Sequence, residues 1–448
     1  MKFKFYFLLI ILPALSNAQN IEVNRKYENI SYTGDKDIRF KVNLKKNNSY
    51  LITVFQHKID VEVILLGPDG KVEQRTDLAD EDSGYDKIDF IAKQDGEYQI
   101  KVQAFDQKVF PEGVINVSIS EYTKKQLSRR KIIQDSLRIE NNKSVQVLDV
   151  KHFWEAFDQL SQCKTFQDSV RIVQTLYLDR GTNGLKEFAR ARDFSAEMFV
   201  KRIGKYKKYY SSIRQNSLVV YQLSGSIDGI TQRFKAIYPD LKAFKVAFVI
   251  GPMLSPGTIS SNFVLIGSEM QVAYKTADLS EIVNPNLKSD ILLTNSLEEV
   301  KTKLEETVAH ELVHLQQKEK SKQACSCPLL EKVIKEGVAE FIAEKNLSLP
   351  LRMTRSRVYG QQNEKILWEE LKNELCSGKT SNWLYNSTAS KERPGDLGYF
   401  IGYKIASSYY EQAADKQRAL VEMIEMDNPL LFLDKSKYDL KFQVATGK

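Results

Sequence analysis

The first part of the chain alternates between apolar and polar side chains in short runs, a period-two pattern typical of half-buried β-strands. The clearest run is Ile38–Leu44. Turn-forming segments separate the runs, among them Gly67–Gly70 and Asp95–Gly96. Further strands are predicted at residues 50–55, 61–66, 88–91, 98–102 and 114–119. Short strands at this spacing predict an antiparallel β-sandwich over residues 19–120.

The apolar period then changes from that of strands to that of helices. Residues 121–149 are charged and helix-prone, and we interpret them as a connector. Phe153, Trp154 and Phe157 open a series of helical patterns that runs to about residue 238. Two short strands follow at 244–250 and 263–266, and helices return from 296 onward. The predicted fold class is therefore multidomain α+β, with a β-sandwich followed by a mainly helical domain, residues 150–448, that contains a small sheet.

The N-terminal segment has the features of a cleavable signal peptide. Lys2 and Lys4 precede the apolar run Phe5–Leu12, and small residues follow at Ser16–Ala18. The apolar run is shorter than the ~20 residues that span a bilayer. We therefore expect cleavage after Ala18, a secreted or periplasmic protein and no transmembrane segment.

Composition narrows the possible partners without identifying one. The chain has 448 residues, is 27% charged and carries a formal charge of +7, with no dense block of lysine or arginine. This argues against a nucleic-acid partner. The four cysteines are Cys163, Cys325, Cys327 and Cys376. A bridge from Cys325 or Cys327 to Cys376 or Cys163 is compatible with export, but the sequence leaves the pairing open.

The strongest chemical signal is the run His310-Glu311-Leu312-Val313-His314, which uses two of the four histidines in the chain. Ser296, with Glu299 three residues later, predicts the capped start of a helix that contains the run. Residues four apart share one helix face, so both imidazoles can reach one zinc ion. Glu311 is then placed to act as general base on a metal-activated water.

A catalytic zinc ion needs a third protein ligand, which we expect on the next helix. Apolar residues from 329 to 342 predict this helix, and it carries Glu336-Gly337-Val338-Ala339-Glu340. We predict Glu336 as the third ligand and Glu340 as the acceptor for the free N–H of a ligating histidine. Gly337 would allow a neighbouring helix or the metal face to approach closely.

These two motifs resemble the gluzincins, the thermolysin-like zinc metallopeptidases, whose third ligand is a glutamate on the helix after the motif helix. Residues 253–270 and 393–403 further resemble an uncharacterised family of predicted zinc-dependent proteases, and the resemblance covers about residues 150–440. The Asp-Gly turns and Gly96-Glu97-Tyr98 resemble the jelly-roll pre-peptidase domains that accompany secreted bacterial peptidases. No catalytic constellation is found in that first domain.

The resemblance implies roles for residues outside the metal motif. The strand Phe263–Ser268 would be the sheet edge that pairs with extended substrate, through Phe263, Leu265 and Gly267. Glu269 would line the cleft and could bind a substrate amino terminus, the alternative being a plain surface or helix-start glutamate. Tyr399 is the candidate oxyanion donor, with Tyr403 and Arg393 behind it, unless it only packs a glycine-lined helix.

The sequence thus predicts a secreted zinc peptidase that binds one zinc ion and takes peptide or protein substrates. One alternative is a catalytically silent relative that keeps the metal and acts as a binding or adhesion protein. In another, the β-sandwich carries the function, although it lacks a clustered aromatic platform. The sequence does not identify a partner for the β-sandwich.

Overall fold

The computed structural model describes residues 18–33, 36–77, 83–104, 112–317, 327–386 and 392–443. The chain divides into two compact units, residues 1–133 and 134–448. Helix α1 (Lys124–Asn141) contains the boundary between them. The expected signal segment, apart from Ala18, lies outside the described residues, as does Cys325.

The first unit is built from two sheets, one of order β1-β3-β8-β5-β6 and one of order β2-β9-β4-β7. All pairings are antiparallel except that of β1 with β3. Alternate side chains of both sheets form one apolar core. The strands are β1 (Gln19–Asn20), β2 (Arg25–Tyr32), β3 (Ile38–Leu44), β4 (Ser49–His57), β5 (Val61–Leu66), β6 (Val72–Thr76), β7 (Ser83–Ile91), β8 (Gly96–Ala104) and β9 (Gly113–Glu121).

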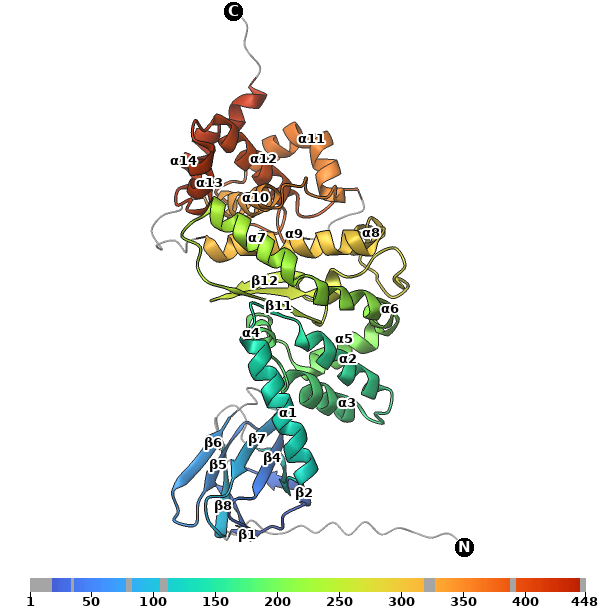
Figure 1. The fold of residues 1–448 in the computed structure, drawn as a ribbon, viewed down its shortest axis with the longest axis vertical. Helices are drawn as coiled ribbons and strands as arrows, with labels where there is room; N and C mark the ends of the chain where they lie inside the picture. The colour runs from blue at the N-terminus through green and yellow to red at the C-terminus, as the bar shows by residue number, and fades with distance from the viewer. Residues whose placement is uncertain are drawn as a thin grey trace, which may run out of the picture. The chain divides into compact units, whose positions relative to one another are not determined.

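The second unit contains a four-stranded sheet of order β10-β11-β13-β12 (Figure 1). Its strands are β10 (Val145–Gln146), β11 (Lys245–Val249), β12 (Gly257–Ser260) and β13 (Phe263–Gly267). Strands β10, β11 and β13 are parallel, whereas β12 is antiparallel to β13 and forms the edge of the sheet. The predicted fold class is confirmed: a β-sandwich is followed by a mainly helical part with a small sheet.

The prediction that Phe263–Ser268 forms the sheet edge is wrong. Residues Phe263–Gly267 form β13, which is bonded to β11 on one side and to β12 on the other. Its backbone groups are therefore used inside the sheet, and Leu265 is fully buried. An added strand requires free N–H and C=O groups, which only an edge strand offers. The edge nearest this position is β12.

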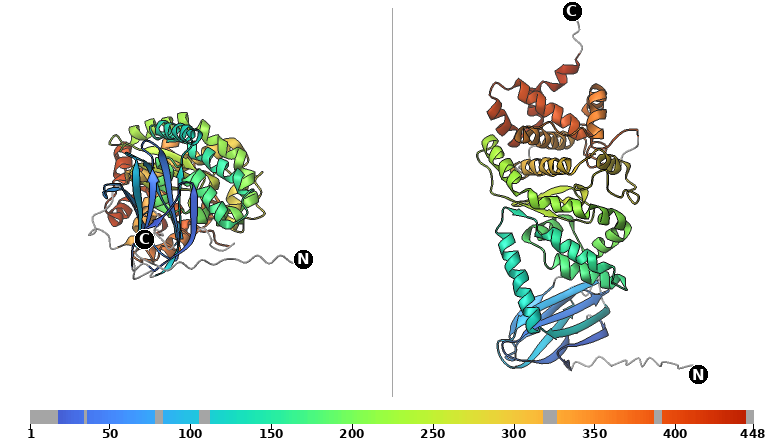
Figure 2. Two further views of the ribbon diagram at one scale, coloured as in Figure 1. Left: turned by 90° about the horizontal axis from the view of Figure 1, so that it is seen from below. Right: turned by 45° about the vertical axis from the view of Figure 1, so that its right-hand side comes forward.

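Helices cover both faces of this sheet. Helix α9 (Leu297–Gln316) lies against β12 and β13, and α4 (Asn183–Arg192) lies against β11, β12 and β13 on the opposite face (Figure 1; Figure 2, right). Helix α10 (Pro328–Leu347) packs on α9 and on α12 (Leu397–Gln412). The other helical elements are α2 (Leu148–Leu160), α3 (Phe166–Val173), η1 (Gln174–Leu178), α5 (Ala196–Lys205), α6 (Lys207–Ser217), η2 (Leu218–Gln222), α7 (Ser224–Ile237), η3 (Ser268–Met270), α8 (Pro285–Leu292), α11 (Arg355–Lys372), α13 (Lys416–Ile424), α14 (Pro429–Ser436) and η4 (Tyr438–Phe442).

One disulfide joins two of the helical segments of the second unit. Cys327, immediately before α10, is bonded to Cys376, which follows α11. This is one of the pairings that the sequence left open, and Cys163 is a free thiol. Within the described residues, no helix combines the length and apolarity that crossing a membrane requires.

Candidate metal centre

The motif helix α9 begins where the capping pattern predicted. Ser296 Oγ accepts the N–H of Glu299 at 3.2 Å, and the Glu299 carboxylate in turn accepts the N–H of Asn295 at 2.9 Å. These contacts satisfy one amide of the first turn and one amide of the residue before the N-cap. The helix then continues without interruption through His310 and His314 to Gln316, so the two histidines lie one turn apart on a rigid element.

Helix α10 brings its glutamate to these histidines by crossing α12 at very short range. A Cβ atom on Gly337 would lie 1.8 Å from the carbonyl carbon of Gly402, and a Cβ on Gly402 would lie 2.0 Å from the carbonyl oxygen of Val333. The two helices therefore touch backbone to backbone, which only glycine permits. The neighbouring helix that the glycine was expected to admit is α12.

Three potential ligand atoms converge on one point. His314 Nε2 lies 3.0 Å from His310 Nε2 and 3.0 Å from Glu336 Oε2, and His310 Nε2 lies 3.3 Å from the same carboxylate oxygen. Ligand atoms around a tetrahedral zinc ion with bonds near 2.1 Å are about 3.4 Å apart. The observed triangle is close to this size. The structure therefore brings together the three residues that the sequence predicted as ligands.

A chain of hydrogen bonds fixes the tautomer of His314. Gln317 Nε2 donates to the carbonyl of Lys335 at 3.1 Å, so its Oε1 is the atom that faces His314 Nδ1 at 2.9 Å. Nδ1 must then carry the proton, which leaves a lone pair on Nε2 directed at the other two atoms. Gln317 follows the last residue of α9, and no sequence motif marks it.

The electrostatics of the cluster favour a positive charge at its centre. Burial opposes protonation of His314, yet the hydrogen bond and charge of Glu336 raise its pKa to about 9. Glu336 is itself buried, and its pKa is nevertheless lowered by the two histidines. Two ring nitrogens and a carboxylate oxygen this close need a cation between them, either a proton or a metal ion. The donor set of two imidazoles and one carboxylate fits zinc.

Tyr385 holds the second oxygen of Glu336. Its hydroxyl donates to Glu336 Oε1 at 2.7 Å, which leaves Oε2 directed at the histidines. Tyr385 lies outside the helices at a φ of 58° and is largely exposed. No role was predicted for Tyr385, because an exposed tyrosine between helices has no periodicity or motif that would mark it.

Replacing Tyr385 with phenylalanine should weaken zinc binding about tenfold, because the carboxylate loses the donor that orients it. The measurement is competitive titration of zinc against a chelator, monitored for the wild-type and variant proteins. Tyr206→Phe, which removes a hydroxyl from a half-buried tyrosine between α5 and α6, serves as the control. Equal zinc affinities in all three proteins would show that the Tyr385 hydroxyl does not support the ligand.

Glu311 lies between the ligand cluster and the sheet edge. A Cβ atom on Gly257, the first residue of β12, would lie 2.7 Å from Glu311 Oε1 and 3.0 Å from a methyl carbon of Thr307. Only a glycine leaves room for the carboxylate against this strand. Burial raises the pKa of Glu311, and the charge of Glu336 acts in the same direction, whereas the histidines and Arg192 lower it. A raised pKa suits a group that must accept and then return a proton.

Of the three residues predicted near the oxyanion, Tyr399, Tyr403 and Arg393, only Tyr399 lies beside the ligand cluster. The ring of Tyr399 stacks on that of His310, with centroids 6.2 Å apart, and lies edge-on to Tyr385 at 6.4 Å. Tyr403 instead donates to Glu344 at 2.9 Å, and Arg393 bonds to Glu370 at 2.6 Å. Tyr399 is therefore adjacent to the cluster, while the other two are engaged elsewhere.

The role expected for Glu340 needs correction. Among the described residues its carboxylate accepts from Arg357 Nη2 at 2.6 Å and from neither histidine. His314 uses Gln317 as its acceptor instead. The physical reason is that a carboxylate removed from water needs an adjacent positive charge, which the Arg357 guanidinium supplies. Burial raises the pKa of Glu340, and the charge of Arg357 lowers it.

The prediction that Glu269 lines the substrate cleft is also wrong. Its side chain is completely buried, and its carboxylate accepts the N–H of Gly251 at 2.6 Å and that of Met253 at 3.1 Å. The hydroxyl of Tyr209 donates to the Glu269 carbonyl at 2.6 Å. Glu269 therefore fastens the turn between β11 and β12, which positions the edge strand, and it cannot meet a substrate amino terminus.

This buried carboxylate should make stability depend on pH. Burial raises the pKa of Glu269 to about 7 from 4.5, although the backbone N–H donors favour its charged form. The folded state thus binds the proton more tightly than the unfolded state, so stability falls as pH rises from about 4.5 to 7. In denaturant titrations, the free energy of unfolding of the wild type minus that of Glu269→Gln should fall by about 2–3 kcal/mol over this range. Asp149 titrates in both proteins and cancels from the difference. A difference that is constant with pH would contradict the expectation.

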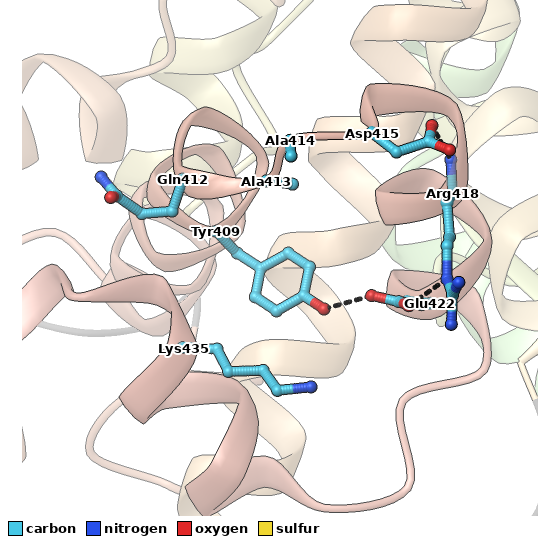
Figure 3. Close-up of a pocket in the computed structure, with 8 residues that line it drawn as sticks. All are labelled: Tyr409, Gln412, Ala413, Ala414, Asp415, Arg418, Glu422 and Lys435. Carbon is cyan, nitrogen blue, oxygen red and sulfur yellow. Dashed lines mark hydrogen bonds and ion pairs between the residues drawn. The ribbon is translucent and has the colours of Figure 1, made fainter.

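A separate open pocket of about 320 Å³ lies among α12, α13 and α14 (Figure 3). Within it the Glu422 carboxylate accepts from the Tyr409 hydroxyl at 2.6 Å and from Arg418 Nε at 2.8 Å. Tyr409 lies ten residues beyond Tyr399 on α12, which corresponds to about 15 Å along the helix axis. The pocket is therefore distinct from the histidine cluster.

Comparison with known proteins gives one family match. Residues 282–428 match the family model described as "Predicted Zn-dependent protease (DUF2268)", and this segment includes His310, Glu311, His314, Glu336 and Tyr399. Several solved structures are similar to about a quarter of the chain, among them a collagenase domain and a lysozyme inhibitor. The pre-peptidase C-terminal domain of a collagenase from Bacillus anthracis is 16% identical, with a TM-score of 0.20, and the alignment covers 24% of this chain and 99% of that chain. Aeromonas hydrophila PliG, a periplasmic inhibitor of g-type lysozyme, is 12% identical, with a TM-score of 0.19. This alignment covers 23% of this chain and 97% of that chain. No curated protein matches the sequence.

Proposed function

We propose that this protein is an exported zinc-dependent peptidase whose metal is held by His310, His314 and Glu336. The observation that carries the proposal is the convergence of three ligand atoms within 3.3 Å of one another, beside a half-buried glutamate that faces a sheet edge. The family match over residues 282–428 supports the same function.

The roles of the residues follow from their positions. When bound, zinc would polarise the scissile carbonyl and lower the pKa of the attacking water. Glu311 takes the proton from this water and returns it to the leaving amine, for which its raised pKa is suited. Tyr399, whose hydroxyl makes no hydrogen bond with the described residues, is the proposed donor to the oxyanion.

The edge strand β12 is the proposed docking site for an extended substrate. Gly267 donates its N–H to the carbonyl of Pro256, so positions 256, 258 and 260 bond to β13. Gly257 and Ile259 then direct their N–H and C=O groups to the open side of the sheet. A peptide that adds to this edge passes directly beside the Glu311 carboxylate.

The test is metal content together with cleavage. Purified residues 19–448 should contain about one zinc per chain and cleave members of a peptide library, and His314→Ala should lose both properties. His57→Ala is the matched control, because His57 lies on β4 of the first unit and should keep both. Absence of stoichiometric zinc from the wild type would contradict the proposal.

Zinc without cleavage of any peptide would instead support a catalytically silent relative that binds its partner. Nothing among the described residues favours that alternative, because Glu311, the three ligand atoms and the β12 edge are all present there.

A further inference from the structure

The face of the edge strand opposite the ligand cluster carries a cation. Side chains alternate along β12, and Gly257 faces α9 with its Glu311. Thr258 must therefore face α4, and its Oγ1 accepts a hydrogen bond from Arg192 Nη2 at 2.9 Å. Arg192 is the last residue of α4, so its backbone is fixed by a helix that packs on the sheet.

The guanidinium of Arg192 is not neutralised by a neighbour. It is exposed, and among the described residues it makes no ion pair. Glu187, an acidic residue of the same helix, is engaged by Ser260 Oγ and by Arg190 at 2.7 Å. Arg192 is nevertheless close to the site, because it contacts Thr258, the neighbour of Gly257, whose Cβ position would lie 2.7 Å from Glu311 Oε1. A positive charge therefore remains available beside the proposed substrate edge.

The pairing pattern of β12 determines which substrate residue meets this charge. Thr258 bonds to β13, so a substrate residue opposite Thr258 occupies a non-hydrogen-bonded position, where facing side chains approach most closely. That side chain lies on the Thr258 face, against Arg192. Because Gly257 is adjacent to Thr258 and contacts Glu311, the position lies within about two residues of the scissile bond.

We propose that Arg192 is a specificity residue that selects an acidic side chain, aspartate or glutamate, at the substrate position opposite Thr258. This inference rests on the proposed peptidase function. Lysine or arginine at the same substrate position would place two like charges together and be disfavoured.

The test compares cleavage of a peptide library by the wild type, Arg192→Ala and Arg192→Glu. The wild type should favour an acidic residue at one position near the cleaved bond by about three- to fivefold over alanine, as expected of a partly solvated ion pair. Arg192→Ala should lose this preference, and Arg192→Glu should favour lysine or arginine instead. Because the ratio is taken within one protein, an effect of the substitution on Glu311 cancels. Lys201→Ala, which removes an exposed cation on α5, should keep the wild-type profile.

A second readout does not depend on turnover. Binding of two fluorescent peptides, with glutamate or lysine at the selected position, is measured by anisotropy to Glu311→Gln and to the double variant with Arg192→Glu. The preference should invert between these proteins and weaken at high salt. Zinc-dependent cleavage with an unchanged profile in Arg192→Glu would overturn the specificity proposal alone. A wild type without zinc-dependent cleavage would overturn both proposals.

Discussion

Glu311→Gln should retain about one zinc per chain and lose peptide cleavage by about a thousandfold, the range expected when a general base is removed. Glutamine has nearly the same shape, so the contact with Gly257 is kept and the ligand atoms are undisturbed. What is lost is the ability to accept a proton. The measurement is kcat/KM on the best peptide from the library, combined with metal analysis of the same sample.

The control for this substitution is Glu298→Gln, the same chemical change on an exposed glutamate of the same helix. It should leave both zinc content and cleavage within about twofold of the wild type, because surface substitutions rarely have larger effects. Cleavage by Glu311→Gln at the wild-type rate would show that another group accepts the proton. Loss of zinc from Glu311→Gln would instead show that Glu311 shapes the ligand cluster.

The predicted ligand residues lie in segments whose structure follows from local sequence patterns. The spacing of His310 and His314 needs only one uninterrupted helix, which Ser296 and a long apolar stripe indicate. The prediction of Glu336 as a ligand required in addition that the next helix pack against the motif helix. The Pro328 start and the apolar face of α10 indicate such a helix, and the glycine after Glu336 indicates a close crossing.

The wrong predictions concern features that depend on tertiary contacts. Strand β12 has four residues and follows Pro256, so the sequence pattern of this segment indicates a loop between two strands. Short strands near proline are typical of sheet edges, but their pairing partner cannot be read from local pattern. Glu269 follows a buried strand and resembles a surface residue. Its burial depends on the backbone N–H groups of a turn 16 to 18 residues earlier in the chain.

The supporting contacts of the cluster were missed for a related reason. Gln317 lies immediately after α9, and Tyr385 lies between α11 and α12. Each acts through a single side chain placed by the surrounding fold, and a single polar residue in a connecting segment gives no sequence signal. Arg192 is comparable, because its proximity to Glu311 arises only when α4 packs on the sheet.

Gly337→Ala should destabilise the protein strongly, lowering the free energy of unfolding by at least about 3 kcal/mol. The added methyl would lie 1.8 Å from the carbonyl carbon of Gly402 and 2.2 Å from the amide nitrogen of Tyr403. Backbone atoms cannot rotate away as a side chain can, so α10 and α12 must separate. For a unit of this size, the melting temperature should fall by at least about 4–5 °C.

A matched control separates this clash from the general effect of the substitution. Gly204→Ala makes the same change inside α5, where a Cβ atom would meet nothing within 4 Å. It should raise stability by about 0.5–1 kcal/mol, because alanine is the better helix former. Separation of α10 from α12 would also move Glu336, which precedes Gly337, relative to Tyr399 on α12. Zinc affinity should therefore fall in Gly337→Ala and stay unchanged in Gly204→Ala. Equal melting temperatures for the two variants would show that the helices do not cross at Gly337 and Gly402.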